Sequence, residues 1–189
     1  MFTVHGLWPD HCDGTFEPVT CDASRNYQNV EEILKLRDPA LYQQMRLYWP
    51  SFTTNSDFWQ HEWYKHGTCL NVVNPECISN YQQYDDMILF FKQTMELAKK
   101  YDIYNALKKE GIVPGNTYKK EDMVNALFKQ LGIRVVPRCR NNVLTEFWSY
   151  FDLYGNNVYV PRVPDYNPTD CANILYPEKT LAFKCPPSN

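Results

Sequence analysis

The 189-residue sequence lacks long apolar runs and net positive charge, and each absence excludes a class of protein. A helix that spans a bilayer needs about 20 consecutive apolar residues, and no such run occurs. The formal net charge of −3 argues against binding of nucleic acid through a broad basic surface. A polyanionic ligand would therefore have to be held in a local pocket.

The sequence also lacks CxxC spacing, N-glycosylation sequons and a signal peptide. Its seven cysteines favour disulfides formed in an oxidising compartment over a zinc or redox motif, and the odd number leaves at least one cysteine without an internal partner. Met1 is followed at once by Phe2-Thr3-Val4, which is typical of a core strand. We therefore expect the chain to be N-terminally incomplete, and N-glycosylation is not expected.

The composition is that of a globular protein, with 44% apolar and 22% charged residues. The aromatic share of 15% is high, and it includes 14 Tyr and 5 Trp. Aromatic side chains fill protein cores, and they also stack on exposed nucleobases. The length predicts one domain over residues 1–189, large enough to bury a core.

The periodicity of apolar residues predicts both helices and strands, without regular alternation, and so an α+β fold. Asp38 is the expected N-cap of a helix with Pro39 at its first position, and Gly67 and Gly132 are expected to end two others. We expect strands at 2–7, 143–153 and 158–161, a loop at 9–29, and helices at 30–36, 39–48, 56–66, 81–101 and 118–131.

Two of the four histidines lie in one predicted helix, beside a glutamate and a lysine. Glu62 and His66 are four residues apart and share a face, and His61 and Lys65 share a neighbouring one. Such side chains are a poor composition for a core stripe. They suit a phosphate site, because lysine neutralises charge and glutamate can orient an imidazole.

A zinc site is the alternative for these histidines. Zinc proteases use His-Glu-x-x-His, which places both histidines on one face of a helix. Here His61 and His66 are five residues apart, which rotates them roughly 140° from each other on an ideal helix. Lys65 between them would also repel a cation. We therefore expect no metal and no cofactor.

A third histidine, His5, follows the predicted first strand, where histidine is more often structural than catalytic. The combination with His61 and His66 changes this interpretation. Cleavage of RNA without a metal needs a base for the 2′-OH, an acid for the leaving 5′-oxygen, and positive charge for the phosphorane. Histidine suits both proton transfers because its unperturbed pKa is about 6.5.

Two segments resemble the signature motifs of the ribonuclease T2 family. His5-Gly6-Leu7-Trp8-Pro9 is similar to the first motif, and His61-Glu62-x-x-Lys65-His66-Gly67-Thr68-Cys69 to the second. The resemblance extends to cysteine placement and to the later elements, over nearly the whole chain. It implies a disulfide-bonded α+β fold, in which helices flank a central antiparallel sheet.

The resemblance also implies the catalytic roles. His66 would be the general base, His5 the general acid and His61 a phosphate ligand, and Glu62 and Lys65 would stabilise the pentacoordinate state. Family members cleave RNA to a 2′,3′-cyclic phosphate and then hydrolyse it to a 3′-phosphate. The implied partner is single-stranded RNA, bound by a monomer; DNA lacks the 2′-OH and would be spared.

Base-binding residues follow from the same resemblance. Trp8, Asp10 and Phe16 fall where fungal-type members hold the base 5′ of the cut. Pro50 and Ser51 are candidates for the second base site, although a helix-ending turn is an equal alternative for them. Base preference stays open, because the position of Phe16 is often Tyr.

The family pattern pairs Cys21 with Cys69 and Cys139 with Cys171. Cys12 and Cys77 match positions whose partners lie upstream of the first motif, and no partner is assigned to Cys185. A catalytic domain at 1–189 would thus lack the usual N-terminal strand region, and we expect it to fold poorly or to belong to a longer secreted or vacuolar precursor. The rival functions are a non-catalytic RNA- or lectin-like binding protein, a zinc hydrolase and an inactive truncated product.

Overall fold

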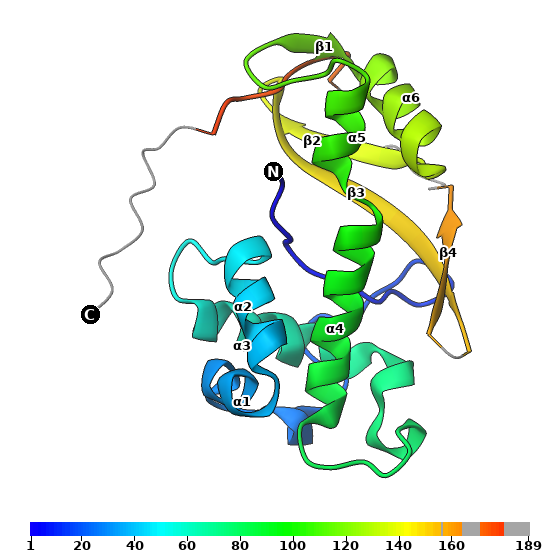
Figure 1. Ribbon diagram of the computed structural model, residues 1–189. Coiled ribbons are helices and arrows are strands. Elements are labelled where there is room, and N and C mark those ends of the chain that lie inside the picture. Colours follow the sequence, from blue (N-terminus) through cyan, green and yellow to red (C-terminus); the bar gives the residue numbers. More distant parts are fainter. Residues whose placement is uncertain (156, 164–170, 180–189) are drawn as a thin grey trace. The chain divides into compact units, whose positions relative to one another are not determined.

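The computed structural model describes residues 1–155, 157–163 and 171–179 (Figure 1). The chain divides into two compact units, Met1–Tyr101 and Asp102–Asn189. The first unit is built from helices and short 3-10 turns, and the second contains a sheet and further helices. The expected α+β class is therefore confirmed.

The first unit contains four α-helices and four 3-10 turns in its 101 described residues. The Asp38 carboxylate accepts a hydrogen bond from the Leu41 N–H, and Pro39 opens the helix, as the cap chemistry predicts. The elements are η1 Ala23–Arg25, α1 Val30–Arg37, α2 Pro39–Tyr48, α3 Asn55–Lys65, η2 Gly67–Cys69, η3 Asn71–Val73, η4 Pro75–Cys77 and α4 Asp85–Lys100.

The core of the first unit is aromatic. Trp59 and Trp63 lie one turn apart on α3 and are fully buried. On α4, Phe90 and Phe91 are also fully buried, and the Phe90 ring meets the Trp63 ring of α3 edge-on at 5.9 Å. Each such side chain contributes about 1.5–3 kcal/mol by leaving water, so these rings fix α3 relative to α4.

In the second unit, the strands form one sheet. Its order is β1-β5-β3-β2, and β4 pairs with β3. The pairings are antiparallel, as expected, except that β3 meets β5 in parallel. The elements are α5 Ile103–Lys109, β1 Thr117–Lys119, α6 Lys120–Leu131, β2 Val135–Arg140, β3 Val143–Tyr154, β4 Val158–Arg162 and β5 Asn173–Leu175.

The ends of four of the five predicted helices differ from the structure, and the helix expected at 30–36 spans Val30–Arg37. The helix expected at 81–101 begins at Asp85, because Tyr84 has a left-handed backbone with φ 78°. The helix expected at 118–131 begins at Lys120, because Tyr118 pairs with Ile174 in the sheet; Gly132, with φ 70°, ends it as predicted. The helix expected at 56–66 spans Asn55–Lys65.

The strand expected at 2–7 is absent from the structure. These residues are irregular, and the Val4 N–H donates to the carbonyl of Tyr48, at the end of α2, at 2.8 Å. The indole N–H of Trp49 donates to the carbonyl of His5, also at 2.8 Å. A β-prone sequence forms a strand only beside another strand, and here the neighbour is a helix end.

Both expected disulfides are present: Cys21–Cys69 in the first unit and Cys139–Cys171 in the second. Cys12 and Cys77 are free and exposed, and Cys185 lies outside the described residues. Among the described helices, none is both long and apolar enough to cross a bilayer.

Candidate active site

The second motif lies at the end of α3. Thr54 caps the start of this helix by accepting a hydrogen bond from the Asp57 N–H. The helix ends at Lys65, and His66 is its C-cap, with φ −113°. Gly67 follows this cap, as expected for the residue that ends the helix; a Cβ there would lie 2.3 Å from the Trp63 ring, so glycine is needed for close packing.

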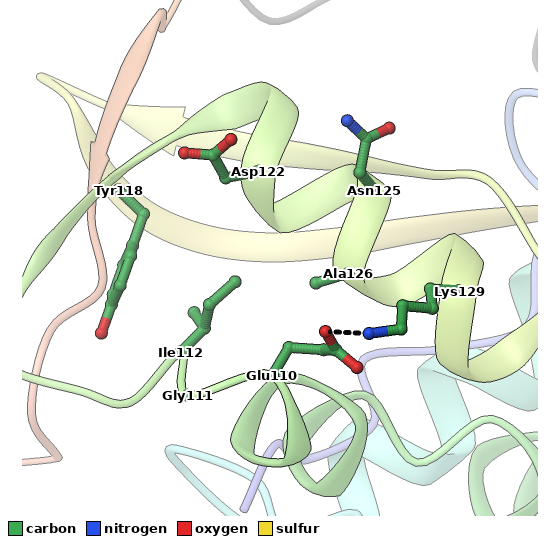
Figure 2. A pocket seen from close by; sticks show the side chains of 8 residues that line it. All are labelled: Glu110, Gly111, Ile112, Tyr118, Asp122, Asn125, Ala126 and Lys129. Carbon is green, nitrogen blue, oxygen red and sulfur yellow. Dashed lines mark hydrogen bonds and ion pairs between the residues drawn. The ribbon is translucent and has the colours of Figure 1, made fainter.

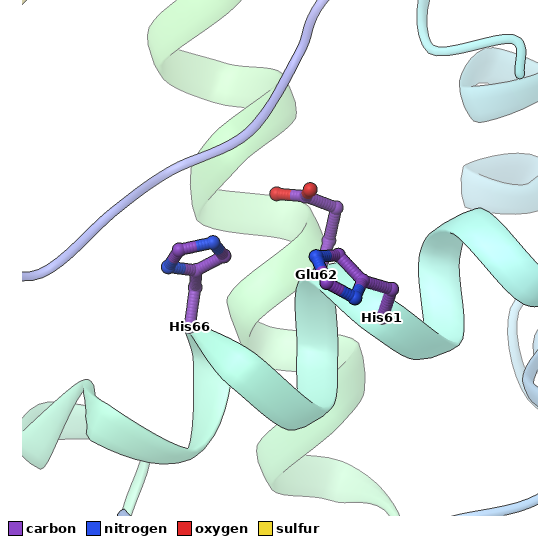
Figure 3. Close-up of side chains that lie close together, drawn as sticks. All are labelled: His61, Glu62 and His66. Atoms are coloured by element: carbon purple, nitrogen blue, oxygen red, sulfur yellow. The ribbon is translucent and has the colours of Figure 1, made fainter. Parts of the chain in front are cut away.

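His61, Glu62 and His66 converge at this helix end (Figure 3). One potential ligand atom from each residue lies within 4.8 Å of the other two. The ring nitrogens of the two histidines therefore lie closer than the ideal-helix argument predicted, because His66 is at the cap and departs from ideal helix geometry. The spacing argument against a metal fails, and only the argument from the charge of Lys65 remains.

The first motif meets the second through Trp8. The Trp8 ring lies edge-on to His5 at 4.7 Å and 5.6 Å from the His66 ring. Its indole N–H donates to Oε2 of Glu62 at 3.1 Å. Residues 54 positions apart are thereby joined, and two imidazoles from separate segments adjoin one indole.

Burial sets the protonation of this cluster. Burial, together with the charges of Lys65, His61 and His5, lowers the pKa of His66 to about 4. Burial also lowers the pKa of His61, with Lys65 and His5 acting in the same sense. Near pH 5, His66 is therefore largely neutral.

Glu62 is shifted in the opposite sense. Its residue is only 2% exposed, and burial raises its pKa to about 7 against the lowering effects of the Trp8 N–H, His5 and Lys65. At pH 5 the Glu62 carboxyl is thus protonated and can donate a hydrogen bond. A neutral buried carboxylic acid is a recognised donor to developing negative charge.

The expected base-binding residues differ in whether they contact this cluster. Trp8 belongs to it, whereas Asp10 and Phe16 lie on the exposed loop that follows, with Phe16 67% exposed. The Ser51 N–H donates to Oδ1 of Asn55. This bond ties the segment after α2 to the first residue of α3, and both the second base site and the helix-ending turn stay open for Pro50 and Ser51.

Two supporting contacts were not predicted from the sequence. Trp49 holds His5 through the indole bond described above. Arg25 is buried, and its Nη2 donates to the Thr68 carbonyl at 2.6 Å. Its own carbonyl accepts the Trp63 indole N–H at 2.8 Å, so Arg25 anchors the chain on both sides of His66. No local pattern marks either contact.

A pocket in the second unit is distinct in character. Figure 2 shows it between α5, β1 and α6, with the Glu110 carboxylate bound to Lys129 Nζ at 2.8 Å. Tyr118 lines it, but its hydroxyl is bonded to the backbone of Val113. None of the candidate catalytic residues lines this pocket.

Comparison with known proteins decides the family. A model of the Ribonuclease T2 family matches residues 1–171. The chain belongs to the ribonuclease T2 family. It is 38% identical over 161 residues to Ribonuclease Rh of Rhizopus niveus, covering 84% of this chain and 68% of the relative. The resemblance expected from the two motifs is confirmed, and the chain is a T2-type endoribonuclease.

Solved structures agree with this assignment. The T2 ribonuclease Actibind has a TM-score of 0.86 at 36% identity, over 93% of this chain and 78% of its own. A variant of RNase MC1 in complex with 5′-GMP has a TM-score of 0.68 at 26% identity, over 92% and 83%. The residues matched by the family model, 1–171, contain the cysteines of both disulfides.

Proposed function

We propose that this T2-family enzyme cleaves single-stranded RNA by metal-independent transphosphorylation. The 2′-oxygen attacks phosphorus, the bond from phosphorus to the 5′-oxygen breaks, and a 2′,3′-cyclic phosphate forms. Hydrolysis then gives a 3′-phosphate. The observation that carries this proposal is the placement of His5 and His66, from separate segments, beside the same indole.

His66 is the general base in this scheme. Because burial lowers its pKa to about 4, it is neutral in weak acid and accepts the 2′-OH proton. His5 is the general acid and protonates the 5′-oxygen as it leaves. In the second step the roles reverse: His5 takes a proton from water, and His66 returns one to the 2′-oxygen.

The phosphorane gains charge that the remaining residues stabilise. Lys65 supplies a positive charge that acts on Glu62 and on His66, and His61 holds the phosphate. Protonated Glu62 donates to a phosphoryl oxygen, whereas ionised Glu62 would repel it. The two pKa values of about 4 and about 7 thus define an acidic working range.

Recognition of the base rests on Trp8, Asp10 and Phe16, with Pro50 and Ser51 as candidates for a second base site. The complex of the RNase MC1 variant with 5′-GMP supports nucleotide binding by this fold. DNA would be spared because it lacks the nucleophile. We further propose one catalytic domain over 1–189, acting as a secreted or vacuolar monomer; the two disulfides favour an oxidising compartment.

The test is cleavage of RNA and DNA at pH 5 in excess EDTA, with analysis of product ends. The proposal predicts RNA cleavage with cyclic phosphate ends, no DNA cleavage, and loss of activity in His66→Ala. Cleavage abolished by EDTA would assign a metal to the cluster of His61, Glu62 and His66. RNA binding without cleavage would instead indicate the rival binding protein.

A further inference from the structure

We infer that Trp8 is a positioning residue for Glu62, in addition to any stacking with a base. Its indole N–H fixes one carboxyl oxygen and leaves the other to act on the phosphate. This inference rests on the proposed function and assigns to Trp8 a role in the rate of cleavage for every base.

The contacts of Trp8 carry the inference. Its N–H donates to Oε2 of Glu62 at 3.1 Å, and its ring adjoins both His5 and His66. A residue that served only as a wall for a base would need an aromatic face but no hydrogen bond to a buried carboxyl. Trp8 instead contacts three of the five candidate catalytic residues.

Gly6 provides independent geometric support. A Cβ at this position would lie 2.1 Å from Oε2 of Glu62 and 2.4 Å from Nε1 of Trp8, the two atoms that form the bond. Neither approach is possible for a real side chain. The glycine between His5 and Trp8 therefore leaves the space in which the bond forms.

The chemistry of the two groups defines the effect. An indole N–H can only donate, so Oε2 acts as an acceptor and the proton of neutral Glu62 resides on Oε1. The titratable groups that act on this carboxyl are His5 on the first segment and Lys65 on α3, with His61 and His66 beside it. Trp8 thus selects which oxygen donates to the phosphorane.

Trp8→Phe separates the two roles, because it keeps an aromatic face and removes the N–H. We expect kcat to fall about 10- to 100-fold, the effect of one lost hydrogen bond to an ionisable group. KM, and binding of a 2′-deoxy oligonucleotide that cannot react, should change less than about threefold. Since the N–H lowers the pKa of Glu62, its loss should shift the alkaline limb of the pH profile upward.

Gly6→Ala is the second variant, and it should reproduce both the fall in kcat and the upward shift. The matched control is Trp148→Phe in β3, which removes an indole bond of the same kind, to Glu146 at 2.6 Å, and should leave kcat and the pH profile unchanged. Circular dichroism would establish that each variant is folded.

The inference is overturned if Trp8→Phe raises KM or weakens oligonucleotide binding while kcat and the pH limb stay unchanged; Trp8 would then only bind the base. Failure of the proposed function is recognised separately, from the wild-type protein. If that protein yields no cyclic phosphate ends, the reaction for which Trp8 positions Glu62 does not occur, and the inference falls with it.

Discussion

The two units differ in secondary structure and in their content of histidine, tryptophan and charged residues. The first contains all four histidines, four of the five tryptophans and thirteen acidic against eight basic residues. The second contains the sheet, with nine acidic and eleven basic residues. The candidate catalytic residues therefore lie in the more acidic unit, so in the proposed mechanism recognition of RNA relies on local groups such as Lys65 and the histidines.

In the first unit, whose described residues form no strand, irregular segments are held by hydrogen bonds from indole N–H groups. Trp8 bonds Glu62, and Trp49 bonds the carbonyl of His5. The indoles of the remaining two donate to backbone carbonyls, Trp59 to that of Trp49 and Trp63 to that of Arg25. In the second unit, β3 is held by antiparallel pairing with β2 and β4, with a register shift between Arg138 and Cys139 of β2. The difference shows how irregular segments can be fixed firmly enough to orient catalytic groups.

The largest effect should come from removing an imidazole of the site. His66→Ala or His5→Ala should lower kcat by about 10²- to 10⁴-fold, the usual contribution of general acid–base catalysis. The matched control is His11→Ala, since His11 is an exposed histidine of the same unit, paired with Glu17. Steady-state kinetics on RNA measures this. Equal losses in His11→Ala and His66→Ala would contradict the assignment.

The second-largest effect should be on stability, because an arginine in a buried ion pair of the first unit should matter more than one in an exposed ion pair of the second. Arg25 is 8% exposed and lies 3.5 Å from fully buried Asp86. Arg25→Met would remove the cation beside that carboxylate, which would keep its hydrogen bonds from the Tyr27 and Tyr81 hydroxyls, and should cost about 3–5 kcal/mol of unfolding free energy. In the second unit, Arg162 and Asp152 are both 44% exposed, so Arg162→Met should cost about 0–1 kcal/mol. Urea denaturation measures both, and similar costs would show that Arg25 is not an anchor.

The smallest expected difference is between the effects of replacing two glycines, Gly67 in the first unit and Gly132 in the second, by alanine. Gly67→Ala places a Cβ 2.3 Å from the Trp63 ring, next to His66; it should cost about 1–3 kcal/mol and lower kcat. Gly132 has nothing within 4 Å of such a Cβ and only its φ of 70° to maintain, so Gly132→Ala should cost about 1–2 kcal/mol with kcat unchanged. Thermal denaturation with kinetics tests the pair, and loss of kcat in both variants would refute the difference.

Local chemistry explains which elements were predictable from the sequence. The Asp38-Pro39 start of α2 was found to the residue, because cap and proline act within one turn. The start of α4 was misplaced, since a left-handed tyrosine at position 84 has no sequence signature. The strand at 2–7 was wrong because pairing depends on a distant neighbour.

The candidate site shows the same division. The two motifs predicted that His5, Glu62 and His66 belong to one site, because the residue types and their spacing within each motif can be read from the sequence. The sequence placed His61 and His66 in the same site, but the close approach of their ring nitrogens was not predicted, because it depends on the backbone at a helix cap. The bond from Trp8 to Glu62 joins residues 54 positions apart, and no pattern within either motif reports it.

The pH dependence of kcat is the most direct test of the protonation states proposed for His66 and Glu62. His66 must be neutral, with its pKa lowered to about 4, and Glu62 must be protonated, with its pKa raised to about 7. The proposed mechanism therefore predicts a bell-shaped profile in excess EDTA that rises through about pH 4 and falls through about pH 7. A rate maximum above pH 8 would contradict these protonation states and the mechanism built on them.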